Sequence, residues 1–178
     1  MTTICAVRDA GGVWMGSDSV ATLNNDGLRT LRAPKIFRSG PFCIGVSGAM
    51  ALNFCVRLNF VPPVRNRSMN VERFIHGPVR EELRRCLLLE SGTSRDKPFK
   101  DVNILLGYES HIFEIHGDGT VVEAAYDYAA IGSGAEYALG AMYASHGGHG
   151  PREVLECALG AACEFDNGSR GPFTILSP

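Results

Sequence analysis

Hydrophobic, β-prone runs separated by polar turn residues predict two β-hairpins in the first part of the chain. Strands are predicted at residues 2–7 and 13–18, joined by the turn-forming Asp-Ala-Gly-Gly between them. A second hairpin pairs residues 35–38 with 42–47 across a Ser-Gly-Pro turn. The polar segment 21–33 between the hairpins is predicted as a loop or wide turn.

The hydrophobic pattern becomes helical in the middle of the chain. Residues 49–60 are apolar without alternation, which predicts a buried helix that the Pro-Pro pair at 62–63 ends. Apolar residues then recur at a helical period across 68–90. A Gly-Pro pair at 77–78 lies inside this second helix, and we expect it to kink or split the helix.

Strands return in the second half of the chain and are followed by another pair of helices. The predicted elements are strands at 102–108, 112–116, 120–124, 128–131 and 173–176, and helices at 137–145 and 151–165. Antiparallel hairpins and paired helices predict an α+β fold with a single domain over 1–178. Two antiparallel sheets between helix pairs would bury both pairs, so we expect a four-layer αββα sandwich.

Length and charge exclude several classes of function. The chain has 178 residues, and 17 Lys and Arg against 19 Asp and Glu give a formal net charge of −2. This balance argues against nucleic acid or an anionic membrane as the main partner. No apolar run approaches the roughly 20 residues of a membrane span. The apolar opening before Arg8 is too short for a secretory signal.

The six cysteines form no CxxC pair, and most lie inside apolar runs. They are Cys5, Cys43, Cys55, Cys86, Cys157 and Cys163. We therefore predict buried, reduced thiols in a cytoplasmic protein. His146 and His149, in a glycine-rich connection, provide too few ligands for a metal ion, so no metal or cofactor is predicted.

The N-terminus offers a candidate nucleophile. Thr2 follows Met1, and because threonine is small, removal of Met1 is expected in a cell. Thr2 would then carry a hydroxyl and a free α-amine, whose pKa of about 7.7–8.0 suits a general base at neutral pH. A threonine paired with its own α-amine is an activated nucleophile. Met-Thr alone favours the start of an ordinary β-strand, because such starts are common.

Short motifs follow one another in order through the chain. They are Thr2-Thr3-Ile4, Gly16-Ser17-Asp18-Ser19, Lys35, Gly45-Val46-Ser47-Gly48, and Ala130-Ile131-Gly132-Ser133-Gly134 followed by Tyr137. In this order and spacing they resemble the proteasome β-subunit and HslV peptidase family, from Thr2 to Leu176. Members of this family are N-terminal-nucleophile hydrolases with an αββα fold, so the resemblance implies both the fold and a hydrolytic activity.

The resemblance implies a role for each matching residue. Thr2 matches the nucleophile, Lys35 the catalytic lysine, and Asp18 the acid that holds this lysine. A cation beside the terminal amine lowers the pKa of that amine and favours the charged form of the hydroxyl. Without the resemblance, Asp18 and Lys35 also fit a structural salt bridge.

Further residues match groups around the nucleophile. The backbone N–H of Gly48, where a strand gives way to a helix, matches the oxyanion donor. Ser133 matches the serine that hydrogen-bonds near the terminal amine. Asp166 and Ser169 resemble a supporting Asp–Ser pair of proteasome β-subunits; HslV-type chains differ there, so the chain resembles a bacterial proteasome-like homologue. These residues also fit a tight turn, a helix N-cap and a helix-ending turn.

The resemblance also implies a substrate site. Substrates of this family bind as an added strand between two loops, here near Thr22 and Ala49. Four residues are expected to approach the first specificity pocket: Ala21, Val46, Met50 and Phe54. All four are apolar, so we predict a preference for apolar side chains before the cleaved bond.

The predicted function is a threonine-type endopeptidase for unfolded proteins or peptides. The resemblance implies a homo-oligomeric ring of about six or seven subunits, usually a double ring that encloses the active sites. It also implies an ATP-dependent unfoldase partner, although this chain has no ATP-binding motif. Two alternatives are a different N-terminal-nucleophile amidohydrolase acting on a small amide, and an inactive structural ring subunit. A retained Met1 would also give an inactive chain.

Overall fold

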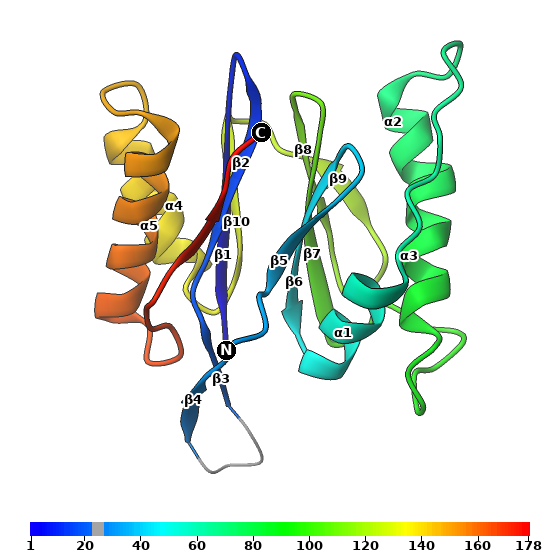
Figure 1. The fold of residues 1–178 in the computed structure, drawn as a ribbon, viewed down its shortest axis with the longest axis horizontal. Helices are drawn as coiled ribbons and strands as arrows, with labels where there is room; N and C mark the ends of the chain where they lie inside the picture. The colour runs from blue at the N-terminus through cyan, green and yellow to red at the C-terminus, as the bar shows by residue number, and fades with distance from the viewer. Residues whose placement is uncertain (23–26) are drawn as a thin grey trace.

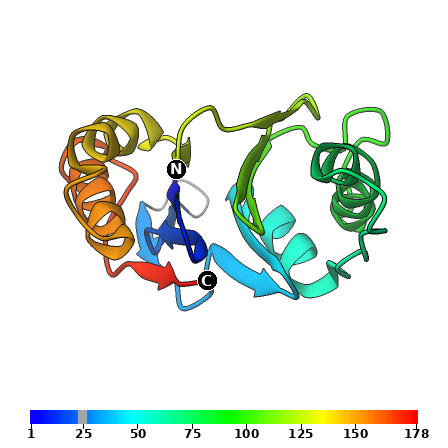
Figure 2. The same ribbon diagram turned by 90° about the horizontal axis from the view of Figure 1, so that it is seen from above.

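Two antiparallel sheets stack face to face between two layers of helices (Figures 1 and 2). The computed structural model describes residues 1–22 and 27–178. One pair of helices covers the first sheet, and the helices from the middle of the chain cover the second. The predicted four-layer αββα sandwich is therefore confirmed.

The first sheet carries the N-terminal strand in its interior. Its order is β10–β1–β2–β11, with every neighbour antiparallel. The strands are β1 (Thr3–Asp9), β2 (Gly12–Ser17), β10 (Tyr128–Gly132) and β11 (Thr174–Leu176). Thr3 pairs with Gly132 on one side, and Ile4 pairs with Ser17 on the other. Residue 2 therefore lies beside the segments that follow β2 and β10.

The second sheet is a meander of five strands. They are β5 (Ile36–Ser39), β6 (Phe42–Gly48), β7 (Val102–Tyr108), β8 (His111–Ile115) and β9 (Val121–Glu123), each antiparallel to the next. The predicted hairpin around Gly-Asp-Gly at 117–119 joins β8 and β9. Strand β6 ends at Gly48, opposite Val102, and leads directly into the first helix.

The prediction of a loop at 21–33 is wrong in part. Strands β3 (Val20–Thr22) and β4 (Leu28–Thr30) pair antiparallel as a small separate sheet. A short, mostly exposed strand such as β4 has no buried face, so its sequence shows no hydrophobic alternation. The rest of the predicted loop includes residues 23–26, which lie outside the described residues.

The helix layer over the second sheet changes its geometry at the Gly-Pro pair, where a disturbance was predicted. Its segments are α1 (Met50–Asn59), α2 (Val71–Phe74), the π-helical turn η1 (Ile75–Val79) and α3 (Arg80–Leu87). The last three follow one another directly, so the helix is not split. Pro78 has no N–H to donate, and it sits inside the wider π turn. The side chain of Asn70 accepts from the backbone N–H of Arg73 at 2.8 Å and sets the helix start.

The other helix layer consists of α4 (Ala135–Ser145) and α5 (Pro151–Phe165). Pro151 occupies the first turn of α5, as predicted, and Asp166 directly follows the helix. Helix α4 begins two residues earlier than predicted, directly after Gly134. The segment from Gly132 to Gly134 therefore connects β10 to α4 beside residue 2.

Three hydrophobic clusters fill the spaces between the four layers. The alternation along β1 divides its side chains between two of them. Ile4 and Ala6 lie in the cluster between the sheets, and Cys5 and Val7 lie in the cluster under α4 and α5. The third cluster, around Phe42, lies between the second sheet and the helices from α1 to α3.

The prediction of buried cysteines holds for only half of them. Cys5, Cys43 and Cys86 are buried, Cys55 and Cys163 are half-buried, and Cys157 is exposed. All six thiols lie within the described residues and are free. Burial raises the pKa of Cys43 to about 11 and that of Cys86 to about 12, so both stay protonated at neutral pH.

Neither a membrane-spanning helix nor a cluster of metal ligands is found in the part of the chain that the structure describes. Among the described residues, none of the helices combines the length and the apolar character that crossing a membrane requires. In the same part of the chain, no three His, Cys, Asp or Glu side chains gather where they could hold a metal ion. His149 lies 3.4 Å from the Glu153 carboxylate.

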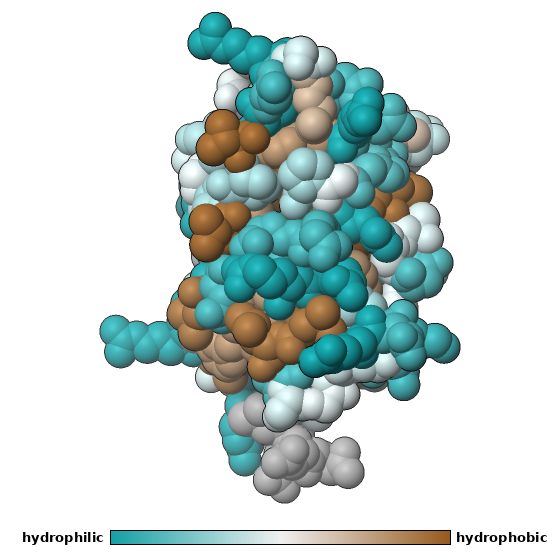
Figure 3. Space-filling view, turned by 90° about the vertical axis from the view of Figure 1, so that its right-hand side faces the viewer, coloured by the Kyte–Doolittle hydropathy of each residue, from teal (hydrophilic) through white to brown (hydrophobic). Residues whose placement is uncertain are grey.

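Both helix layers carry exposed hydrophobic side chains on their outer faces. Figure 3 shows them scattered among charged residues over the layer from α1 to α3. The large side chains on or beside these helices are Phe54, Leu58, Val61, Val64 and Leu89; those of α4 and α5 are Tyr137, Leu139, Tyr143 and Phe165. Groups of exposed apolar side chains are common at contact surfaces between proteins.

Candidate active site

Thr2 lies immediately before the interior strand β1 and is almost fully buried. Its backbone N–H donates to Ser133 Oγ at 3.1 Å. Its hydroxyl donates to the carbonyl oxygen of Met1 and accepts from Lys35 Nζ at 2.9 Å. The hydroxyl and the backbone nitrogen of Thr2 therefore each contact a polar side chain from another element.

Asp18 and Lys35 form a buried ion pair beside this hydroxyl. Lys35 is 1% exposed, and its Nζ lies 2.7 Å from Asp18 Oδ1. Asp18 also accepts from the backbone N–H groups of Thr3 at 2.9 Å and Val20 at 3.2 Å. These bonds satisfy a carboxylate that would otherwise be costly to bury. Asp18 thus holds the lysine and, through Thr3, the start of β1.

The surroundings of Lys35 favour loss of its proton. Burial lowers the pKa of Lys35 below its usual value, and the negative charge of Asp18 opposes this effect only in part. A lysine in this state still provides positive charge near Thr2 but releases a proton more readily than an exposed one. Such a group suits chemistry at a neighbouring hydroxyl.

Ser133, Asp166 and Ser169 form a hydrogen-bond chain behind Thr2. Ser133 Oγ donates to Asp166 Oδ2 at 2.9 Å, and Ser169 Oγ donates to the same oxygen at 2.6 Å. Burial alone would raise the pKa of Asp166. The hydrogen bonds from Ser169, Ser133 and the Gly168 backbone outweigh burial and hold that pKa below its ordinary value.

The depressed pKa of Asp166 predicts a pH-dependent contribution to stability. The contribution is fully present above the ordinary aspartate pKa of about 3.9 and is lost as the pH falls through the lower folded-state value. Asp166→Asn should therefore lower the free energy of unfolding at pH 7, and the difference from wild type should shrink below about pH 4. Denaturant unfolding across this pH range measures it, and a difference that stays constant down to about pH 2 would contradict the assignment.

Gly48 lies at the end of β6, and its backbone conformation requires glycine. Its φ is +121°, and a Cβ atom at this position would overlap the carbonyl oxygen of Asp101. Ala49 follows it as the residue before α1, with its N–H directed to the same oxygen at 3.4 Å. The tight-turn interpretation of Gly48 therefore holds, and its function as an oxyanion donor stays a prediction.

The predicted substrate residues lie on both sides of this turn with different exposure. Ala21 and Val46 are buried, and Val46 belongs to the core under α1. Met50 is half-buried, and Phe54, one helical turn further along α1, is 37% exposed. The remaining two, Thr22 and Ala49, are exposed. Thr22 and Ala49 are therefore open to contact, whereas Val46 has almost no exposed surface, and the substrate site stays a prediction.

Two residues of the site were not predicted from the sequence. Thr3, expected only as a strand residue, contacts Ser169 through their hydroxyls at 2.6 Å and binds Asp18 through its backbone. Asn53 donates to the backbone carbonyl of Lys35 at 3.1 Å. Asn53 is one of three polar residues in the mostly apolar run 49–60, and Thr3 appeared only as part of the Thr2-Thr3-Ile4 motif, without a function of its own.

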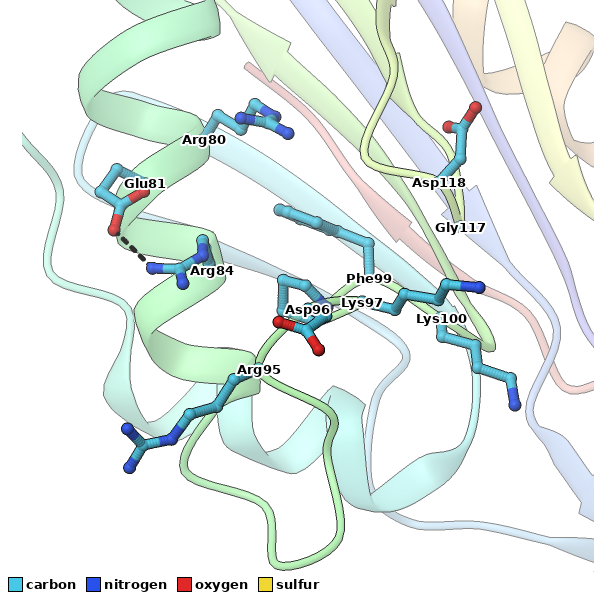
Figure 4. Close-up of a pocket in the computed structure, with 11 residues that line it drawn as sticks. Arg80, Glu81, Arg84, Arg95, Asp96, Lys97, Phe99, Lys100, Gly117 and Asp118 are labelled. Carbon is cyan, nitrogen blue, oxygen red and sulfur yellow. Dashed lines mark hydrogen bonds and ion pairs between the residues drawn. The ribbon is translucent and has the colours of Figure 1, made fainter.

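A charged pocket of about 740 Å³ lies apart from these residues (Figure 4). It is bounded by α3, residues 95–100 and the turn at 117–118, and no predicted site residue lines it. Arg84 pairs with Glu81 at 2.9 Å on its wall. A smaller pocket of about 400 Å³ includes Ala49 in its lining. The candidate chemistry therefore centres on Thr2 rather than on the more voluminous pocket.

Comparison with known families agrees with this arrangement. The sequence profile of the family described as "Proteasome subunit" matches residues 1–158. The protein belongs to the proteasome subunit family. The resemblance drawn from the motifs between Thr2 and Tyr137 is thereby confirmed.

Individual relatives of this proteasome-family protein cover nearly its whole length. The ATP-dependent protease subunit HslV of Caldicellulosiruptor saccharolyticus is 25% identical over 98% of this chain and 97% of its own. The structure of Thiobacillus denitrificans BPH in complex with epoxomicin is 25% identical, with a TM-score of 0.80 over 99% of this chain and 100% of that one.

More distant structures share the fold alone. Eukaryotic HslV from Trypanosoma brucei superposes with a TM-score of 0.71 at 22% identity, over 98% of this chain and 97% of its own. Anbu from Yersinia bercovieri superposes with a TM-score of 0.68 at 20% identity, over 98% of this chain and 80% of its own.

Proposed function

We propose that this protein is a self-compartmentalised threonine endopeptidase whose nucleophile is Thr2 after removal of Met1. The contact of Lys35 Nζ with Thr2 Oγ1 at 2.9 Å carries the proposal. Burial lowers the pKa of Lys35, and its ammonium group contacts the hydroxyl of Thr2. Removal of Met1 would place the terminal amine beside the same hydroxyl. These two groups together can activate the hydroxyl as a nucleophile. A structural salt bridge alone would not require this contact with Thr2.

The chemistry proceeds in two steps. Once Met1 is removed, the free amine of Thr2 takes the proton of the hydroxyl, and Oγ1 attacks the carbonyl carbon of the substrate peptide bond. The N–H of Gly48 stabilises the resulting oxyanion. The C–N bond then breaks, the amine returns its proton to the leaving nitrogen, and an ester on Thr2 remains. Water, deprotonated by the same amine, hydrolyses the ester and restores Thr2.

Each of the other polar residues supports one group of this reaction. Lys35 lowers the pKa of the terminal amine and stabilises negative charge on Oγ1. Asp18 keeps Lys35 in place. Ser133, held by Asp166, contacts the nitrogen of Thr2 and orients it, and Ser169 joins Asp166 to Thr3.

The substrate is an unfolded protein or peptide bound as an added strand. Backbone groups near Thr22 and Ala49 bind its main chain, which provides affinity without sequence specificity. Of the four apolar residues predicted for this pocket, Met50 and Phe54 have exposed surface that can contact the side chain before the cleaved bond, so apolar side chains are preferred there.

The active sites lie inside a homo-oligomeric ring of about six or seven subunits, stacked as a double ring in the cytoplasm. The exposed hydrophobic side chains on both helix layers support assembly. The similarity to an ATP-dependent protease subunit supports an ATP-driven unfoldase as partner. Light scattering should give the mass of such a ring, and a stable monomer would contradict compartmentalisation.

One experiment tests the proposed function directly. Purified protein shown by intact mass to lack Met1 should cleave fluorogenic peptides after apolar residues. A matched version with a non-removable N-terminal extension should be inactive, because its Thr2 has no free amine. Epoxomicin, which is bound by the Thiobacillus protein, should raise the melting temperature of the Met1-free form alone.

Different outcomes would contradict different parts of this proposal. Equal cleavage by the extended version would contradict the terminal amine as base. Cleavage only after acidic or basic residues would contradict the apolar pocket. Hydrolysis of small amides without cleavage of any peptide would favour the amidohydrolase alternative.

A further inference from the structure

Asn53 is a buried polar residue in the middle of helix α1. It is 1% exposed and lies between Leu52 and the next buried residue of the helix, Val56. Its side-chain nitrogen donates to the backbone carbonyls of Lys35 at 3.1 Å and Val46 at 3.4 Å. One side chain thus joins α1 to the start of β5 and to the middle of β6.

The carbonyl of Lys35 is held by two donors at once. Besides the amide of Asn53, the backbone N–H of Val46 donates to it at 3.1 Å. Two donors use both lone pairs of a carbonyl oxygen, which fixes its direction. The side chain of Lys35 extends from this fixed backbone to Thr2 Oγ1 and Asp18 Oδ1, at 2.9 and 2.7 Å.

Stability alone does not explain an asparagine at this position. Its side-chain oxygen has no hydrogen-bond partner within the described residues. An unpaired buried acceptor is destabilising, whereas an apolar side chain of similar size carries no such penalty. The inward neighbours Leu52 and Val56 are apolar. The benefit of Asn53 therefore lies in the groups that its amide holds in place.

We propose that Asn53 is a positioning residue that fixes the backbone of Lys35 so that its ammonium group meets Thr2. The inference rests on the proposed peptidase function. Because Asn53 also binds the carbonyl of Val46, the same amide connects the lysine to the strand that leads to Gly48. A shift of about 1 Å in a reacting group lowers a rate by about 100-fold, so the loss of this amide should be visible in kcat.

Asn53→Leu in the Met1-free protein tests this proposal, with Asn59→Leu as the matched control. Asn59 belongs to the same helix but is exposed, and its amide donates to the carbonyl of Cys55 within that helix. We expect Asn53→Leu to lower kcat by about 10- to 100-fold with little change in KM. Its melting temperature should equal or exceed that of wild type, and its ring mass should be unchanged. Asn59→Leu should match wild type in kcat, KM, melting temperature and ring mass.

A second variant separates the donor from the shape of the side chain. Asn53→Val also lacks the donating nitrogen but differs in shape from leucine, so it should lower kcat to the same extent as Asn53→Leu. If Asn53→Leu does not fold, Asn53→Ser provides a second test. The serine side chain is too short to donate to the carbonyl of Lys35, so kcat should fall in the same way.

The outcomes distinguish this inference from the proposed function. A wild-type kcat in folded Asn53→Leu or Asn53→Val, while the wild-type protein is active, would overturn the positioning function alone. An equal fall in Asn59→Leu would do the same. A wild-type protein that cleaves no peptide would overturn the proposed function, and this inference with it.

Discussion

Thr2→Ala should abolish peptide cleavage while the fold and the ring remain intact. Alanine has no hydroxyl to attack the carbonyl, and loss of the nucleophile in other hydrolases lowers kcat by about 10⁶-fold. Within the described residues, the hydroxyl of Thr2 has hydrogen bonds only to Met1 and Lys35, so its removal leaves the interior of β1 unchanged. Fluorogenic peptide assays measure the loss, and light scattering measures the assembly.

A matched threonine variant controls for general effects of removing a hydroxyl. Thr174 lies in β11 of the same sheet and is half-buried. Thr174→Ala should retain wild-type kcat. The protein with the non-removable N-terminal extension sets the background rate. If Thr2→Ala cleaves peptides faster than this background, Thr2 is not the nucleophile. Intact mass must show that Met1 is absent from each variant, since alanine in place of Thr2 is also small enough to allow its removal.

Lys35→Met should have the second largest effect, and it should act on both activity and stability. The methionine side chain has a similar length but no charge, so it cannot lower the pKa of the terminal amine or stabilise Oγ1. Acid–base assistance of this kind contributes about 10²- to 10⁴-fold, and kcat should fall accordingly. Asp18 would remain buried without its cation, which should cost about 3–5 kcal/mol of stability.

The double variant Lys35→Met with Asp18→Asn separates the two interpretations of this ion pair. Replacing both charges leaves no unpaired ion in the interior, so the free energy of unfolding should recover much of the loss. Activity should stay as low as in Lys35→Met. Recovery of activity together with stability would show that the pair is only structural, which was the alternative interpretation of these residues.

Patterns of short range predicted most of the fold. The β-prone run of β1 and the Gly-Asp-Gly turn between β8 and β9 are visible in the sequence, because both signals act between neighbouring residues. Prediction was wrong where local propensity competed with tertiary context. The exposed strand β4 showed no pattern and was predicted as part of a loop. The expected disturbance at the Gly-Pro pair takes the form of a π turn around Pro78.

The sequence by itself determined the layer order, the family and the candidate nucleophile, since periodicity and ordered motifs are visible along the chain. Only the tertiary structure decided which side chains meet. Thr2 contacts Ser133 across 131 positions, and Thr3 contacts Ser169 across 166. Such contacts arise when distant segments pack at one end of a sheet and leave no local signal. For the same reason Asn53 showed only as one of three polar residues in helix α1, until the fold placed its amide on the backbone of Lys35.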